Sequence, residues 1–245
     1  MIDMREIEKE SHFIKAKKEF VKSFTDNNRC EDEEKCDWGK FKESFLEFAK
    51  YKCPICEYQV ITTSSHIDHF RPKKAGYEFL RCCCDNYMIM CADCNSRYKG
   101  VEFPIYDGFK ATIKEEISKE KPLLINPRED NIYEYFELFF VKSLAGKLLL
   151  EIKVKEGLNG YKKAKAEKTI ELYGIGNCET NLKVDSCRLE ILETYFDEFI
   201  ELAEAKEKND EEEFNKLLNS RRMRKKKEYG FVEFIKKNQF KIDII

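Results

Sequence analysis

Long apolar segments are missing from this chain of 245 residues. No run approaches the ~18 apolar residues that a membrane-spanning helix needs, so the sequence predicts a protein without a membrane segment. The first residues, MIDMREIEKESHF, also lack the apolar core of a secretory signal peptide. We therefore expect a cytoplasmic protein, in which the eleven cysteines act as metal ligands or buried thiols and not as disulfides.

An excess of charge of either sign is also missing, because 45 Lys and Arg face 47 Asp and Glu. A uniformly basic coat for nucleic acid is thereby excluded, whereas a local basic surface is not. Residues 50–110 carry nine basic and seven acidic side chains, and residues 221–245 carry nine and three. These two positive segments are where we expect contact with a polyanion.

Proline is scarce, and all five prolines lie between residues 54 and 127. The middle of the chain is therefore predicted to be rich in loops, and the flanks are free to form helices. Apolar periodicity predicts helices over residues 12–24, 38–50, 161–173, 179–207, 210–228 and 230–237. A β-hairpin is predicted over 132–154, where YEYFELFFV and KLLLEIKV flank SLAG.

These patterns predict an α+β fold that is mostly helical. We expect three regions along the chain. They are an N-terminal helical segment over 1–50, a central core with the candidate site over 51–127, and a hairpin with C-terminal helices over 128–245.

Two Cys-x2-Cys pairs lie in the central region. Cys53 and Cys56 form one, and Cys91 and Cys94 form the other. Two such turns complete a structural Zn2+ site of four thiolates. A redox or zinc-storage protein is the alternative, since single Cys-x2-Cys pairs also occur in redox proteins. Adjacent cysteines chelate poorly as a unit, so Cys82, Cys83 and Cys84 are interpreted as packing or incidental residues. The remaining cysteines are interpreted as structural or free: Cys30, Cys36, Cys178 and Cys187.

The segment SHIDHFRPK, residues 65–73, holds two of the three histidines. Asp68 beside His69 places a hard-oxygen metal ligand next to a base that titrates near neutral pH. Phosphodiester hydrolysis needs both, because a divalent ion stabilises the charge on the phosphorane and a base deprotonates water. Downstream, Asn86 precedes the second cysteine pair and Asn95 follows it.

This arrangement, over residues 53–100, resembles the HNH, or ββα-metal, nucleases. In that family an acidic residue or histidine precedes the base histidine on a strand, a middle Asn lies in a loop, and a final Asn or His stands on a helix. The resemblance implies a zinc-braced ββα-metal finger inserted in a helical body. Position by position it implies His69 as general base, Asn86 as the residue that orients the base and its loop, and Asp68 and Asn95 as ligands of a catalytic Mg2+ or Mn2+.

A narrower resemblance covers most of residues 50–190. The strings HIDHFRPK, CNSRYKGVEFP, LLINPRED and TIELYGIGN, in that order, are similar to the HNH subunit of Septu-type and retron-linked anti-phage systems (PtuB-like). That resemblance implies a metal-dependent endonuclease, with DNA as the expected substrate and an ABC-type ATPase subunit as partner. The chain departs from the family at RCCCD, residues 81–85, which puts the geometry of that loop in question.

A non-catalytic zinc-knuckle module that binds nucleic acid or protein is the alternative function. The joint presence of Asp68, His69 and Asn95 disfavours it, because a pure binding module does not need the three together.

Several further residues have two interpretations. His66 lies two residues before Asp68, so on a strand both side chains share a face, and His66 is either an additional metal or phosphate ligand or a surface residue. The candidate phosphate contacts near the motif are Arg71, Lys73, Arg97 and Lys99. In the run RRMRKKK, residues 221–227, they are Arg221, Arg222 and Arg224. Each of these cations is otherwise part of a solvated surface.

Overall fold

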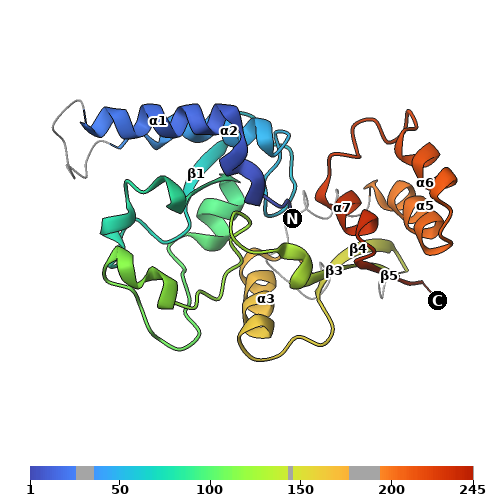
Figure 1. The fold of residues 1–245 in the computed structure, drawn as a ribbon. Coiled ribbons are helices and arrows are strands. Elements are labelled where there is room, and N and C mark those ends of the chain that lie inside the picture. The colour runs from blue at the N-terminus through green and yellow to red at the C-terminus, as the bar shows by residue number, and fades with distance from the viewer. Residues whose placement is uncertain (26–35, 143–145, 177–193, 245) are drawn as a thin grey trace.

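The computed structural model describes residues 1–25, 36–142, 146–176 and 194–244 (Figure 1). The fold is mixed α+β with small sheets. The helices are α1 (Ser11–Thr25), α2 (Lys42–Phe48), α3 (Gly160–Tyr173), α5 (Phe196–Glu207), α6 (Glu211–Leu218) and α7 (Gly230–Lys236). The strands are β1 (Ser65–His69), β2 (Tyr87–Cys91), β3 (Phe136–Lys142), β4 (Leu148–Val154) and β5 (Phe240–Asp243). Within these ranges no helix is long and apolar enough to cross a bilayer.

The N-terminal helices form an aromatic layer against β2. Phe13 and Phe20 of α1 meet Phe41 at ring-centroid distances of 5.4 and 5.1 Å, and Phe13 also meets Phe45 of α2 at 5.2 Å. Tyr87, the first residue of β2, packs edge-on against Phe20 at 6.0 Å. The apolar spacing of the two helices therefore gives β2 a fixed support. The helix predicted over 12–24 is confirmed as α1, whereas the segment predicted as a helix over 38–50 is a 3-10 turn over Trp38–Phe41 followed by α2.

β1 and β2 form a two-stranded antiparallel sheet in which Asp68 pairs with Met88 and His69 with Tyr87. A π-type helical turn, η5 (Asp93–Lys99), follows β2 and packs on it. Gly100 ends this turn with a φ of 51°, a left-handed backbone conformation that glycine adopts without steric cost. The order strand, strand, helix thus occupies the part of the chain where a compact finger was expected.

The second sheet has the strand order β4-β3-β5. β3 and β4 form the predicted hairpin, and β5 adds to β3 in parallel after the chain has passed through α5, α6 and α7. β5 is not predicted by the sequence pattern. Its four residues are too short a pattern to distinguish from a tail, and their partner strand lies about 100 residues earlier in the chain.

The helix predicted over 210–228 is wrong in its second half. α6 ends at Leu218, and residues 220–229 form successive turns, such as the one closed by Lys226 N–H and the Met223 carbonyl at 2.9 Å. A continuous helix would place six cations within two helical turns, where like charges repel. Part of the helix predicted over 179–207 lies outside the described residues, and its last portion is α5. The helices predicted over 161–173 and 230–237 are confirmed as α3 and α7.

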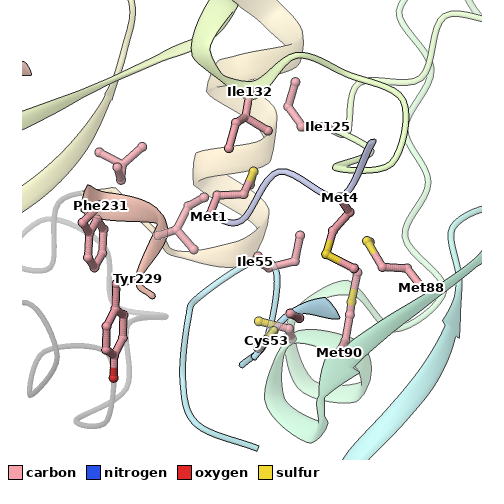
Figure 2. Packing of buried hydrophobic residues seen from close by; sticks show 14 of the residues in the cluster. Met1, Met4, Cys53, Ile55, Met88, Met90, Ile125, Ile132, Tyr229 and Phe231 are labelled. Atoms are coloured by element: carbon pink, nitrogen blue, oxygen red, sulfur yellow. The ribbon is translucent and has the colours of Figure 1, made fainter. Parts of the chain in front are cut away.

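One continuous hydrophobic core connects the N-terminus, the first cysteine pair, β2 and the C-terminal helices. The loop over residues 53–57, called here the cysteine loop, carries the first cysteine pair. Figure 2 shows Met1 and Met4 packed between Ile55 of this loop, Met90 of β2 and Ile132. Beside this core the fully buried Glu57 accepts hydrogen bonds from the Met1 ammonium group and the backbone N–H of Gly230. The cysteine loop is thereby attached directly to the start of α7.

Candidate active site

The four cysteines of the two Cys-x2-Cys pairs come together. Their sulfur atoms all lie within 4.8 Å of one another, and the Cys56 and Cys91 Sγ atoms are 3.7 Å apart. A tetrahedral zinc ion with Zn–S bonds of about 2.3 Å would hold its sulfurs about 3.8 Å apart. The backbone N–H of Cys94 also points to the Cys91 sulfur at 3.4 Å. Cys53, Cys56, Cys91 and Cys94 could therefore hold a structural metal such as zinc, which would join the 53–56 loop to the end of β2.

Asp68, His69 and Asn95 line one pocket of about 320 Å3, called here the His69 pocket. β1 supplies Asp68 and His69, and η5 supplies Asn95. The remaining lining residues are Ile67, Pro72, Lys73, Lys74, Gly100 and Val101. The three residues that the sequence analysis placed in a common catalytic role thus share one concave surface. Lys74 is an additional cation of this pocket that the sequence analysis did not single out.

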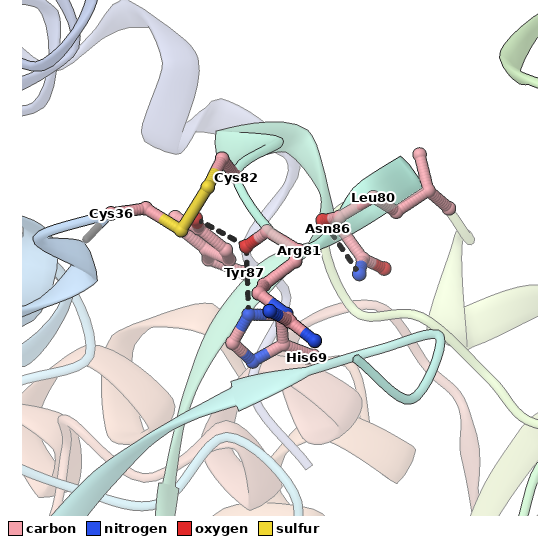
Figure 3. The surroundings of a disulfide bond; sticks show 7 residues. All are labelled: Cys36, His69, Leu80, Arg81, Cys82, Asn86 and Tyr87. Carbon is pink, nitrogen blue, oxygen red and sulfur yellow. Dashed lines mark hydrogen bonds between the residues drawn. A yellow bond between two sulfur atoms is a disulfide. The ribbon is translucent and has the colours of Figure 1, made fainter. Parts of the chain in front are cut away.

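His69 is held in a defined orientation, as Figure 3 shows. Its Nε2 lies 2.9 Å from the carbonyl oxygen of Arg81, which also accepts a hydrogen bond from the Tyr87 hydroxyl at 2.7 Å. The imidazole packs edge-on against Tyr87 at 4.9 Å and Trp38 at 5.3 Å. Because a carbonyl oxygen can only accept, Nε2 carries the proton and Nδ1 is the basic nitrogen. In the described part of the chain Nδ1 has no hydrogen-bond partner.

The charge state of His69 follows from its surroundings. Burial lowers the pKa of His69 to about 4, the hydrogen bond to the Arg81 carbonyl opposes this shift, and the nearby cations Lys73, Lys99 and Arg81 add to it. The imidazole is therefore neutral at physiological pH.

Asp68 is 4% exposed and makes one ion pair, from Oδ1 to the Lys99 ammonium group at 3.0 Å. Lys99 also donates to the His69 carbonyl at 2.8 Å. The second carboxylate oxygen, Oδ2, is buried and has no hydrogen-bond partner among the described residues. Burial raises the pKa of Asp68 to about 6, although Lys99 acts in the opposite direction. A buried carboxylate oxygen without a donor fits a bound cation, so the residues of the pocket are suited to a divalent metal.

Asn95 and His66 form a pair beside the pocket, with Asn95 Nδ2 3.1 Å from His66 Nδ1. The amide group donates in this contact, and the carbonyl oxygen Oδ1 of Asn95 remains available as a ligand. His66 therefore contacts a candidate metal ligand, and we interpret it as a residue that orients Asn95.

Asn86 closes the loop between β1 and β2. Its side-chain oxygen accepts from the Arg71 N–H at 2.8 Å, and its amide donates to the Arg71 carbonyl at 2.9 Å. The backbone N–H of Phe70 also bonds to the Asn86 carbonyl at 2.8 Å. Asn86 is thus within hydrogen-bonding distance of the residues that directly follow His69.

Cys36 and Cys82 form a disulfide, with Cα atoms 5.5 Å apart (Figure 3). The expectation that the chain contains no disulfide, and the interpretation of Cys82 as incidental, are therefore wrong. The two residues are separated by 46 positions in the sequence. They meet because Trp38 and Arg81, which are close to them in the chain, both pack against His69. Outside the four-cysteine cluster and this disulfide, Cys83 and Cys84 are the described cysteines and are not disulfide-bonded, and Cys30, Cys178 and Cys187 lie outside the described residues.

The candidate phosphate contacts near the motif divide into two groups. Arg71 and Lys99 are buried, and Arg71 Nε donates to Glu120 at 2.7 Å just as Lys99 pairs with Asp68. Lys73 is exposed on the His69 pocket. Arg97 is exposed but does not line that pocket. Among these four, Lys73 is therefore the cation best placed to meet a phosphate near His69.

Comparisons with known proteins relate part of this chain to a Septu protein. No protein-family model and no solved structure matches the chain. A curated protein described as Septu protein PtuB, from Bacillus mycoides (strain KBAB4), is 34% identical over 138 residues. The aligned residues are 51% of this chain and 42% of that protein, so the match spans less than half of the relative's length. Over about half of its length the chain is therefore similar to a Septu PtuB protein.

Proposed function

We propose that this protein is a metal-dependent endonuclease of the HNH type that hydrolyses phosphodiester bonds in nucleic acid, with DNA as the first substrate to test. The observation that carries the proposal is the His69 pocket. It combines a neutral, oriented imidazole with a carboxylate oxygen that has no hydrogen-bond donor among the described residues and with the side chain of Asn95.

The residues that would hold the catalytic ion are Asp68, through Oδ2, and Asn95, through Oδ1. Carboxylate and amide oxygens are the ligands that Mg2+ and Mn2+ prefer. When bound, such an ion stabilises the negative charge that develops on the phosphorane and on the leaving oxygen.

His69 would act as the general base through Nδ1. The Arg81 carbonyl fixes the tautomer, and Trp38 and Tyr87 fix the ring plane. A pKa of about 4 keeps the imidazole unprotonated but makes it a weak base. The negative charge of an approaching phosphodiester raises the pKa of a neighbouring imidazole, so the bound substrate strengthens the base that takes the proton from the attacking water. Lys73 and Lys74, on the same pocket, would contact the phosphates next to the scissile bond.

The similarity to a Septu protein supports a role in anti-phage defence. We propose an ABC-type ATPase subunit as the partner that directs the nuclease to its substrate. The nearly balanced charge of the chain is consistent with delivery by a partner, since such a surface gives weak binding of nucleic acid by itself.

One observation favours the non-catalytic alternative, a zinc-knuckle binding module. Lys99 already neutralises Asp68, and a buried ammonium group 3.0 Å from a carboxylate disfavours a second cation nearby.

Cleavage assays separate the two functions. Supercoiled plasmid DNA and a structured RNA are each incubated with the protein and Mg2+ or Mn2+. Wild type and His12→Ala should cleave, because His12 lies on the exposed side of α1 and pairs with Glu47. His69→Ala should not cleave but should keep the fold, measured by circular dichroism. Equal cleavage by His69→Ala and wild type would rule out the assigned base. Binding without cleavage in wild type, for both substrates and both metals, would favour the binding module.

A further inference from the structure

The basic run 221–227 is divided into two faces by a buried methionine. Met223 is 2% exposed and belongs to the hydrophobic core. Its carbonyl oxygen accepts hydrogen bonds from the backbone N–H groups of Lys226 and Lys227, both at 2.9 Å. This turn fixes the backbone around Met223, so the side chains of the run leave it in different directions and its cations are not equivalent.

One face is already neutralised by α5. Arg222 pairs with Glu201 at 3.2 Å and with Glu198 at 3.7 Å. Lys226 also pairs with Glu198, and its ammonium group lies 5.2 Å from the centre of the Tyr195 ring. These two cations hold the turn against α5 and have little charge left for a ligand.

The other face is not neutralised. Arg221, Arg224 and Lys227 are exposed and line a pocket of about 450 Å3, together with Leu218, Asn219 and Ser220. We call this pocket the basic hollow. In the part of the chain that the structure describes, no acidic residue lines it. Within the described ranges, none of its three cationic side chains has an ion pair or a hydrogen-bond partner. The hollow therefore concentrates three positive charges on a fixed turn.

We propose that the basic hollow is a second nucleic-acid contact, which binds backbone phosphates away from the His69 pocket. This inference rests on the proposed nuclease function. Arginine offers a planar fork of donors that matches the oxygens of a phosphate, and the hollow presents two such forks and a lysine. The two pockets share no residue, and Figure 1 shows α6 and β1 on opposite sides of the molecule. A bound strand or duplex would thus be held at two separate places.

The lining also favours nucleic acid over an acidic protein. Leu218 is the only apolar residue of the hollow, whereas protein interfaces usually contain an apolar centre. Phosphate contacts need no such centre, because they are electrostatic and polar.

The test compares two triple variants that remove the same charge. Arg221→Ala/Arg224→Ala/Lys227→Ala changes the hollow. The control, Lys163→Ala/Lys208→Ala/Lys216→Ala, removes three exposed lysines that are each paired with a glutamate three or four residues earlier or later in the chain. Both are made in the His69→Ala background, and the affinity for a labelled mixed-sequence DNA duplex is measured by fluorescence anisotropy over a range of salt concentrations.

The hollow variant should bind more weakly, and the slope of log affinity against log salt should fall by up to about 2.7, three contacts at about 0.9 each. Preference between duplexes of different sequence should not change, since phosphate contacts carry no sequence information. The control should keep the wild-type slope.

Identical slopes for the hollow variant and the control would overturn the proposal. So would a hollow variant with unchanged DNA affinity that no longer binds its ATPase partner, because the occupant would then be an acidic protein surface. The salt-dependence experiment can succeed or fail independently of the cleavage assay. If wild type fails to cleave but the hollow variant shows the reduced slope, the nuclease assignment fails and the hollow remains a nucleic-acid site.

Discussion

At the residue scale, His69 combines a buried ring with one basic nitrogen that has no partner in the described structure. The Arg81 carbonyl requires a proton on Nε2, and burial and three nearby cations oppose a proton on Nδ1. Sequence alone places a histidine next to an aspartate. It does not reveal the carbonyl, 12 residues later in the chain, that selects the tautomer.

The lowered pKa of His69 predicts a pH-dependent stability. The unfolded chain binds a proton at this histidine near pH 6.5, whereas the folded chain does so only near 4. The free energy of unfolding should therefore fall as the pH is lowered from about 6.5 to 4, by up to about 3 kcal/mol, and the contribution is fully present above 6.5. Chemical denaturation of wild type and His69→Ala at several pH values measures this difference.

The difference in unfolding free energy between wild type and His69→Ala reports the contribution of the imidazole alone. Asp68, whose pKa burial raises to about 6, titrates in both and acts in the opposite direction. A difference between wild type and His69→Ala that stays constant from pH 7 to pH 4.5 would contradict the assigned environment of His69.

At the scale of elements, the disulfide connects the two segments that hold the His69 ring. Cys36 lies two residues before Trp38, and Cys82 directly follows Arg81. α1 and α2 are joined to the β1–β2 loop in this way, in addition to the aromatic layer around Tyr87. The edge-on contact with Trp38 and the hydrogen bond to Arg81 should therefore depend on the same covalent link.

Removal of this link should destabilise the protein. In Cys36→Ser/Cys82→Ser the unfolded chain regains the conformational entropy of a loop of 46 residues. The free energy of unfolding should therefore fall by about 2–4 kcal/mol. For a chain of this size the melting temperature should fall by roughly 5–15 °C. Cys83→Ser is the matched control, because Cys83 is a free, half-buried thiol next to the disulfide. The control should melt like wild type and lose stability on addition of a phosphine reductant, whereas the double variant should be insensitive to it.

At the scale of the whole molecule, Glu57 joins regions that are distant in the sequence. Its backbone N–H bonds to the Cys53 carbonyl at 2.8 Å, and its carboxylate receives the Met1 ammonium group and the Gly230 N–H. The cysteine loop, the first residue and the start of α7 therefore meet at one buried carboxylate. A substitution at the start of α7 should therefore lower the free energy of unfolding of the whole protein.

Gly230→Ala tests this connection. An added Cβ would overlap the Met1 carbonyl oxygen and crowd the Glu57 carboxylate, and the backbone atoms there cannot move aside easily. We expect a loss of unfolding free energy on the order of 2–4 kcal/mol, within the range for overpacked or disrupted buried sites. Gly157→Ala is the control, since its Cβ meets nothing within 4 Å and its cost is only that of a positive φ. A smaller loss for Gly230→Ala than for Gly157→Ala would contradict the described packing.

The sequence by itself determined the features that depend on local pattern. Apolar spacing determined α1, α7 and the β3–β4 hairpin, because a helix or a strand must bury one side of itself. The Cys-x2-Cys spacing determined the four-cysteine cluster, because a short turn already directs both thiols to one point. The placement of Asp68 and His69 on one strand was implied by the resemblance of their motif to the HNH nucleases, and both residues lie at the end of β1.

Only the tertiary structure decided which charged groups are free to act. Arg71 and Lys99 are cations of the same central region as Lys73, yet Glu120 and Asp68 hold the first two in buried ion pairs while Lys73 lines the pocket. The pairing of Cys36 with Cys82, the tautomer of His69 and the two faces of the basic run were decided in the same way. The physical reason is common to all four. Each depends on a partner that is remote in the chain or on the direction of a side chain in a non-repeating turn, and neither leaves a periodic signal in the sequence.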